Sequence, residues 1–392
     1  MTKKRTRSTG KRTTRRRRSG SSLRSLVLLL VLILVLAVGD WLGWIDIDWQ
    51  ELLGGETAST GPGPTVVAVE PVSGDWYQLY FTSPQYPDEP ANRIHTIKDG
   101  LIQVLNSAQR SLDIAIYELN LDDVGDAILA ARDRGITVRM VTDTDELEEL
   151  ETLIRLEEEG IPIVPDNRGA IMHNKFVVVD GQAVWTGSWN FTVNDTYRNN
   201  NHAIYIRSPE LAQNYTVEFE EMFNTNAFGP TSPANTPNPK LQLGDTLIET
   251  CFASEDECGS QLAALINQAQ QNIRFMAFSF THEGIGQAVE AKARAGLAVQ
   301  GVFETRGSET EHSEFGRMRQ QQLDVWQDGN PYTLHHKVFI IDERAVAFGS
   351  FNFSANADDS NDENMLIIHN PELARQFLSE FKRVYAQAQT AQ

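Results

Sequence analysis

Two stretches of this 392-residue chain repeat the same reactive side chains at the same spacing. HNKFVVVDGQAVWTGSWNFT begins at residue 173, and HHKVFIIDERAVAFGSFNFS begins 162 residues later, at residue 335. Each holds a His-x-Lys pair, an Asp and a Gly-Ser-x-Asn run: His173, Lys175, Asp180, Ser188 and Asn190, then His335, Lys337, Asp342, Ser350 and Asn352. Histidine exchanges protons near neutral pH, whereas lysine supplies a positive charge. Together the stretches predict one anion site with two titratable groups.

The His-x-Lys spacing indicates which side chains face the site. Side chains alternate between the two faces of a strand, so His335 and Lys337 point one way and His336 points the other. The first stretch has Asn174 at the place of His336, which predicts a structural role for His336. The returning strands carry Ser and Asn two residues apart, on one face, beside the His-x-Lys pairs. We therefore predict phosphate-binding roles for Ser188, Asn190, Ser350 and Asn352.

The two aspartates lie at an odd offset from the histidines, seven residues further along the chain. This offset places Asp180 and Asp342 on the opposite face or at the end of the strand. Asp180-Gly181 is also a strong signal for a tight hairpin turn. Both aspartates are therefore predicted to organise a turn without touching substrate.

A site with two lysines, two histidines and neutral hydroxyl and amide groups suits a phosphodiester. Its non-bridging oxygens gain negative charge during displacement at phosphorus, which fixed positive charges stabilise. One histidine can act as nucleophile and the other as general acid for the leaving oxygen. Because the chain itself supplies the positive charge, we expect neither a metal nor another cofactor.

The repeat extends beyond the motifs and predicts the architecture. LDIAIYELN at residues 112–120 corresponds to IRFMAFSFT at residues 273–281, and each is followed by a helical stretch and a further strand pattern. Strands that alternate with helices predict an α/β fold. We expect two tandem domains, residues 76–228 and 247–392, related by a pseudo-two-fold axis, with a linker at 229–246 and the shared site at the axis.

The doubled pattern resembles the signature of the phospholipase D superfamily, His-x-Lys-x4-Asp-x6-Gly-Ser-x-Asn, and the resemblance covers residues 76–388. It implies two phospholipase D-like αβα-sandwich domains, one active site between them, a covalent phosphohistidine intermediate, and metal-independent hydrolysis or transfer. The segments YFTSP, CFASEDEC and NDENMLII look most like the branch that contains small bacterial endonucleases and the mitochondrial cardiolipin hydrolase.

The same resemblance implies an acidic partner for a motif histidine. Glu363 lies 28 residues after His335, whereas the first half has Asn201 at the equivalent place. A carboxylate partner stabilises imidazolium and raises its pKa. We therefore expect Glu363 to pair with His335, as the general acid, and Asn201 to orient His173, as the nucleophile. The predicted catalytic set is His173, Lys175, His335, Lys337 and Glu363.

The N-terminal region predicts membrane targeting. Residues 1–24 hold eleven Lys and Arg and no acid, so the other 368 residues carry 23 bases against 53 acids. Residues 25–45 are mainly apolar, and residues 46–75 have the Gly, Thr and Pro content of a linker. We favour an uncleaved anchor with a cytoplasmic tail and an extracytoplasmic body. A cleaved signal and a secreted body are the alternative.

The remaining reactive residues are few. Cys251 and Cys258 are the two cysteines of the chain, and outside the cytoplasm we expect them to form a local disulfide. The histidines outside the repeated motif have no predicted function, with His202 and His282 as alternative pocket residues.

The leading hypothesis is a membrane-tethered phosphodiesterase that hydrolyses phospholipid. An anchor would hold the site near lipid headgroups, and an acidic body has no general attraction for nucleic acid. A nuclease acting on DNA or RNA is the second hypothesis, and a transferase of the cardiolipin synthase kind is the third. A catalytically dead binding module is the fourth, although both motifs are intact. Because both half-sites lie on one chain, we expect a monomer to be active.

Overall fold

The computed structural model describes residues 71–391, which belong to one compact unit, Val66–Gln392. The basic tail, the expected membrane segment at 25–45 and most of the linker at 46–75 lie outside the described residues. Within residues 71–391, no helix combines the length and the apolar character needed to cross a membrane. The expected anchor therefore stays a prediction.

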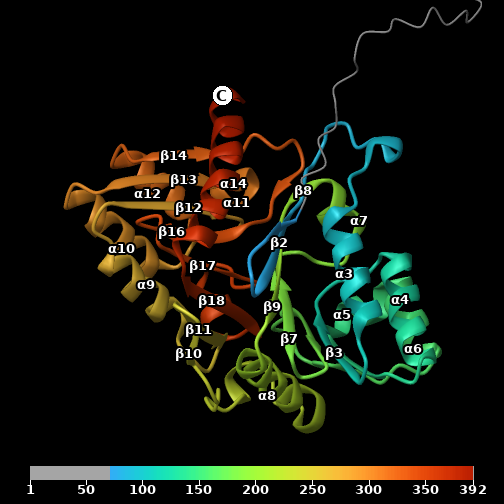
Figure 1. The fold of residues 1–392 in the computed structure, drawn as a ribbon. Coiled ribbons are helices and arrows are strands. Elements are labelled where there is room, and N and C mark those ends of the chain that lie inside the picture. Colours follow the sequence, from blue (N-terminus) through green and yellow to red (C-terminus); the bar gives the residue numbers. More distant parts are fainter. Residues whose placement is uncertain (1–70, 392) are drawn as a thin grey trace, which may run out of the picture. The chain divides into compact units, whose positions relative to one another are not determined.

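The first half of this unit is built on an eight-stranded mixed sheet in the order β1-β2-β9-β7-β6-β3-β4-β5. Figure 1 labels β2, β9, β7 and β3 of this sheet. Its strands are β1 (Val72–Ser73), β2 (Tyr77–Phe81), β3 (Ser111–Ile116), β4 (Thr137–Thr142), β5 (Ile163–Pro165), β6 (Lys175–Val179), β7 (Ala183–Gly187) and β9 (His202–Arg207). Its helices are η1 (Pro90–Asn92), α3 (Thr96–Ser107), α4 (Asp122–Asp133), α5 (Thr144–Glu149), α6 (Glu151–Glu158), α7 (Val193–Tyr197) and α8 (Pro209–Thr225).

The second half repeats this order strand by strand, as β10-β11-β18-β17-β16-β12-β13-β14. Its strands are β10 (Lys240–Leu243), β11 (Thr246–Ala253), β12 (Asn272–Ala277), β13 (Ala298–Phe303), β14 (Asp324–Gln327), β16 (Lys337–Ile341), β17 (Ala345–Gly349) and β18 (Glu363–His369). Its helices are α9 (Cys258–Gln268), α10 (Glu283–Arg294), α11 (Thr305–Ser308), α12 (Glu314–Gln320), α13 (Ala355–Asp359) and α14 (Pro371–Thr390). The predicted α/β fold with two similar halves is confirmed.

Each sheet packs against its own helices on one face and against the other half on the opposite face. α3, α4 and α6 cover the outer face of the first sheet, and α9, α10 and α12 cover that of the second. The inner faces pack with α8 and α14 into a shared core, to which Val178 of β6 and Ile340 of β16 both contribute. Because β6 and β16 are buried on both faces, their sequences KFVVV and KVFII are apolar at successive positions.

Two short contacts join the halves next to the motifs. β8 (Asn199–Asn200) pairs in parallel with β15 (Thr333–Leu334), and Met172 forms an isolated bridge with Asp362. The backbone N–H of His173 donates to the Asp362 carbonyl at 3.0 Å, and that of His335 donates to the Asn200 carbonyl at 3.0 Å. Each motif histidine is thus held in place by the opposite half.

The segment expected to be a linker at 229–246 has structure of its own. It contains η2 (Gly229–Thr231) and β10, which pairs antiparallel with β11 and extends the second sheet by one strand. The Thr and Pro content that suggested a linker is confined to the turns before β10. The chain thus enters the second sheet at Lys240, within the segment whose composition suggested a linker.

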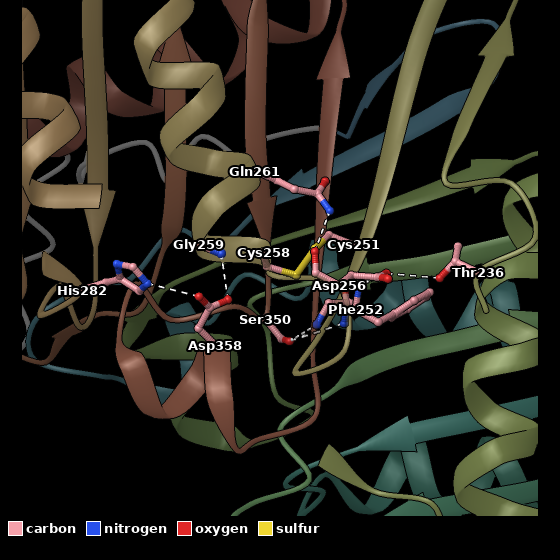
Figure 2. Close-up of a disulfide and its surroundings, with 11 residues drawn as sticks. Thr236, Cys251, Phe252, Asp256, Cys258, Gly259, Gln261, His282, Ser350 and Asp358 are labelled. Carbon is pink, nitrogen blue, oxygen red and sulfur yellow. Dashed lines mark hydrogen bonds and ion pairs between the residues drawn. A yellow bond between two sulfur atoms is a disulfide. The ribbon is translucent and has the colours of Figure 1, made fainter. Parts of the chain in front are cut away.

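The expected disulfide is present and fastens α9 to the second sheet (Figure 2). Cys251 of β11 and Cys258, the first residue of α9, are bonded across a Cα separation of 5.7 Å. The next residue, Gly259, donates its N–H to Asp358 of α13 at 2.8 Å. His282 contacts the other oxygen of the same carboxylate at 3.2 Å. The bridge therefore belongs to a cluster that ties α9, α10 and α13 together.

Candidate active site

A pocket of about 680 Å³ lies between the two halves and is lined by both motif histidines. Both are nearly buried, with His173 5% and His335 7% exposed. The lining residues are Tyr117, Glu118, Ile171, His173, Asn190, Thr192, Asn194, Asp195 and Asn199 from the first half, and Phe278, Ser279, Glu304, Arg306, Gly307, Thr333, His335 and Asn352 from the second. The structure thus brings the two half-sites to one pocket, as expected.

His173 takes its partner from the other half. Its Nδ1 lies 2.8 Å from Oε2 of Glu363, at the start of β18. Burial, reinforced by the charges of Lys175 and Lys337, holds the pKa of His173 well below its usual value. Burial also raises the pKa of Glu363 to about 8, against the effect of the lysines. The expected pairing of Glu363 with His335 is wrong, because β18 begins at the interface and the side chain of its first residue, Glu363, reaches across to His173.

His335 is oriented by the first half in the same crossed manner. Its Nδ1 lies 2.9 Å from Oδ1 of Asn201 and 3.3 Å from Oδ2 of Asp195. Asn201 therefore serves His335, and the expectation that it orients His173 is also wrong. Burial lowers the pKa of His335 to about 4, although the ion pair with Asp195 acts in the opposite direction.

Asp195 is a site residue that the sequence analysis missed. It lies on α7, and Asn190 and Asn199 hold its two carboxylate oxygens at 2.9 and 2.6 Å. Although burial alone would raise it, the pKa of Asp195 is held below its usual value by His335 and these donors. The repeat contained a signal for it: at the same offset of 162 residues the second half has Ala357. The first half thus has an acid at position 195, on α7, and none at position 201, whereas the second half has its acid at position 363.

Both motif lysines are buried next to their own histidines. Lys175 and Lys337 donate from Nζ to the carbonyls of His173 and His335, at 2.9 and 3.0 Å. Burial lowers the pKa of Lys175 to about 8 and that of Lys337 to about 7, where repulsion by Lys175 adds to the effect. The ammonium groups are therefore poorly solvated, and an anion in the pocket would stabilise them.

The serines and asparagines of the motifs play different parts. Ser188 and Ser350 are fully buried and do not line the pocket. Ser188 donates to Asn201 at 2.9 Å, and Ser350 accepts the backbone N–H of Asn364 at 3.0 Å. Both hydroxyls are thus hydrogen-bonded within their own half, and their phosphate-binding role stays a prediction.

The motif asparagines do line the pocket. Asn190 is 4% exposed, and the Oδ1 atoms of both Asn190 and Asn352 are buried without a hydrogen-bond partner among the described residues. A buried amide oxygen without a partner is unfavourable by itself. Asn190 and Asn352 thus keep hydrogen-bonding capacity for a molecule in the pocket.

The motif aspartates organise turns, as predicted. Asp180 and Asp342 both have positive φ, 56° and 53°. The Asp342 carboxylate accepts the backbone N–H groups of residues 270, 271 and 272 at 2.8, 2.7 and 2.9 Å. The Asp180 carboxylate accepts the backbone N–H groups of residues 109, 110 and 111 in the same way. Each aspartate therefore fixes the start of the strand next to its own hairpin.

The other histidines do not line the pocket. His336 points away from it, with Nε2 3.0 Å from Glu380 of α14, which confirms its predicted structural role. His202 is buried behind the site, with its Nδ1 3.0 Å from that of His336. His282 caps α10. Across residues 71–391, no group of three or more His, Cys, Asp and Glu side chains is arranged to hold a metal ion.

Comparison with known proteins extends this description. A family model described as "Cardiolipin synthase, PLD-like domain" matches residues 101–223 and 262–385, which is one match in each half. A phospholipase D of Rickettsia bellii is 30% identical over 166 residues, which cover 41% of this chain and 82% of that protein. A mitochondrial cardiolipin hydrolase of Chlamydomonas reinhardtii is 29% identical over 124 residues, or 31% of this chain and 56% of that protein.

A solved structure is similar over both halves. The phosphatidylserine synthase of Haemophilus influenzae is 14% identical to this chain, with a TM-score of 0.56. The likeness covers 80% of this chain and 88% of that one. At this level of identity the likeness concerns the fold alone.

Proposed function

This chain belongs to the phospholipase D superfamily, and we propose that it hydrolyses the phosphodiester of a phospholipid at the pocket between its halves. One observation carries the proposal. Two buried histidines, one from each half, face a single pocket, and each has a lysine and a hydrogen-bonded carboxylate beside it. This arrangement supplies a nucleophile, an acid and positive charge for a phosphoryl group.

In the first step His173 attacks phosphorus. Its Nδ1 is occupied by Glu363, so the lone pair of Nε2 is available for the pocket. The P–O bond to the leaving alcohol breaks, and a phosphohistidine forms on His173. His335 donates the proton that the leaving oxygen requires, which lowers the barrier when the alcohol is a poor leaving group.

In the second step a water molecule attacks the phosphorus of the phosphohistidine. The neutral His335 accepts the proton of this water, and the P–N bond breaks, which returns an uncharged His173 and a protonated His335. The products are one alcohol and one phosphomonoester. Lys175 and Lys337 stabilise the charge on the non-bridging oxygens in both steps.

The unequal surroundings of the two histidines support these roles. A nucleophile must be neutral, and the pKa of His173 lies well below its usual value because of burial and the lysine charges. An acid must hold a proton more firmly than the nucleophile does; burial lowers the pKa of His335 to about 4, and the ion pair with Asp195 opposes this lowering. The roles are those expected from the sequence, but the carboxylate behind the acid is Asp195 and not Glu363.

Membrane lipid is the proposed source of the phosphodiester. The relatives include proteins named phospholipase D and mitochondrial cardiolipin hydrolase. The apolar segment at 25–45 would hold the catalytic body at the extracytoplasmic face of a membrane. Transfer to a second alcohol is the alternative, because the matching family model is described by cardiolipin synthase. In that case the second alcohol would replace water in the second step.

A substrate panel tests the proposal on the full chain in detergent. We expect hydrolysis of phosphatidylcholine or cardiolipin and of bis(p-nitrophenyl) phosphate, unchanged by EDTA, and little cleavage of single-stranded DNA. With bis(p-nitrophenyl) phosphate, whose leaving group needs no proton, His335→Asn should let a phosphohistidine accumulate on His173, detectable by mass spectrometry. His312→Asn changes an exposed histidine and should behave as wild type. Cleavage of DNA alone, loss of activity in EDTA, or a phosphoryl group on His335 would contradict the scheme.

A further inference from the structure

The pocket must tell apart the two alcohols that a phosphodiester joins, although its two walls are related by the repeat. Tyr117 and Phe278 are equivalent residues, and each packs its ring against the motif histidine of its own half. The Tyr117 ring lies 5.2 Å from that of His173, and the Phe278 ring lies 4.8 Å from that of His335. The next residue along the chain differs, because the first half has Glu118 and the second has Ser279, and both line the pocket. The walls are therefore alike around the histidines and unlike one residue further on.

Glu118 acts on Lys175 by its charge, but no described side chain contacts its carboxylate as an ion-pair or hydrogen-bond partner. Of the other pocket carboxylates, Asp195 pairs with His335. Glu304 accepts the N–H of Gly307 at 2.5 Å and caps α11. Within residues 71–391, Glu118 has neither an ion pair nor a side-chain hydrogen bond, and its surroundings act on it only through burial and the charges of Asp195, Glu146 and Lys175. A half-buried carboxylate in a catalytic pocket is thus left for a ligand.

We propose that Glu118 binds an ammonium group on one of the two alcohols of the substrate, so that the pocket selects zwitterionic phosphodiesters of amino alcohols. The inference rests on the proposed function and narrows its substrate class. A carboxylate forms its strongest hydrogen bonds with a charged donor. It repels a second phosphate, and this repulsion adds to the specificity against polyanions. Lys175 and Lys337 already serve the phosphodiester, so the cation recognised by Glu118 would come from the substrate.

The charge state of Glu118 gives the inference a pH signature. Burial raises the pKa of Glu118 to about 7; Asp195 of α7 and Glu146 of α5 act in the same direction, and Lys175 of β6 opposes them. Only the ionised carboxylate attracts an ammonium group. Selectivity for the cationic substrate over a substrate without a cation should therefore increase as the pH rises from 6 to 8.

Two soluble esters with the same leaving group test the inference without a lipid surface. The full chain is assayed with p-nitrophenyl phosphocholine, which carries a cation, and with bis(p-nitrophenyl) phosphate, which does not. In Glu118→Gln and Glu118→Ser, kcat/KM for the choline ester should fall about tenfold, and that for the other ester should change less than about threefold. Glu148→Gln removes the same charge from an exposed position outside the pocket and should leave both values unchanged.

The outcomes distinguish a failure of the Glu118 inference from a failure of the proposed phosphodiesterase function. Equal losses for both esters, or no loss for the choline ester, would overturn the inference and leave the phosphodiesterase activity standing. Full activity of Glu118→Gln together with low activity of Glu118→Ser would also overturn it, because Gln mimics a protonated carboxyl that donates to phosphate. If the wild type cleaves neither ester, the proposed function itself fails.

Discussion

At the scale of single residues, the two histidines differ through the carboxylates behind them. His173 faces Glu363, whose pKa burial raises to about 8, while His335 faces Asp195, whose pKa is held below its usual value by His335 and nearby donors although burial alone would raise it. At neutral pH Asp195 is therefore ionised and favours a protonated His335. The first half has Asn at position 201 and an acid at position 195, so His335, the proposed general acid, still has a charged partner.

Asp195→Asn should weaken acid catalysis more than nucleophilic attack. Without the carboxylate the pKa of His335 falls further, so the limb of the pH profile that reports the acid moves to lower pH. We expect kcat to fall about 10- to 100-fold for an alkyl leaving group, and much less for p-nitrophenolate, which needs no proton. Steady-state rates for the two types of ester from about pH 3 to pH 8, a range that includes the His335 pKa of about 4, measure the difference.

A second substitution should restore part of the activity that Asp195→Asn removes. Asp195→Asn combined with Asn201→Asp places the carboxylate at the position that Glu363 occupies in the other half, within reach of the same Nδ1. The double variant should regain part of the lost rate and the lost pH limb. An equal loss for both leaving groups, with no rescue, would show that Asp195 only holds α7 in place.

At the scale of elements, the hairpin aspartates set the strands that carry the motifs. The Asp342 carboxylate accepts hydrogen bonds from three backbone N–H groups at the start of β12, and β12 pairs with β16. The left-handed φ of 53° at this position also restricts the side chains that are tolerated there. Position 342 therefore links hairpin geometry to the placement of Lys337, the first residue of β16.

Asp342→Ala should destabilise the fold, and Asp342→Asn should do so less. Alanine removes the acceptor for three N–H groups and fits the left-handed conformation poorly, for a loss of about 1–3 kcal/mol in the free energy of unfolding. Asparagine keeps one acceptor oxygen and tolerates positive φ. Urea unfolding followed by circular dichroism measures both variants. Equal stabilities of the alanine variant and the wild type would exclude the capping role.

At the scale of the whole molecule, the packing of the two halves brings one buried lysine from each half close to the other beside the pocket. Burial lowers the pKa of Lys337 to about 7, and the charge of Lys175 from the other half contributes to the shift. Neither half alone contains both cations. In the proposed function an anion would therefore be bound by two lysines whose positive charge is weakened by burial and by their mutual repulsion.

Anion binding should consequently weaken as the pH rises through the lysine pKa values of about 7 and about 8. Diethyl phosphate keeps one negative charge across this range and is a suitable competitive inhibitor. Its inhibition constant should increase about tenfold between pH 6 and 9. Lys337→Arg stays charged and should flatten the profile. A wild-type constant that does not change with pH would contradict the low lysine pKa values.

The sequence by itself determined the repeat, the α/β class, the two half-sites and the turn role of Asp180 and Asp342, because spacing and side-chain alternation are local properties. It also indicated correctly that His336 faces away from the site. Only the tertiary structure decided which half supplies each partner. His173 and Glu363 are 190 residues apart and meet across an interface, so no local pattern could pair them. The pKa values of the lysines and of Glu118 depend on burial, which many neighbouring elements produce together, so the sequence alone could not give them.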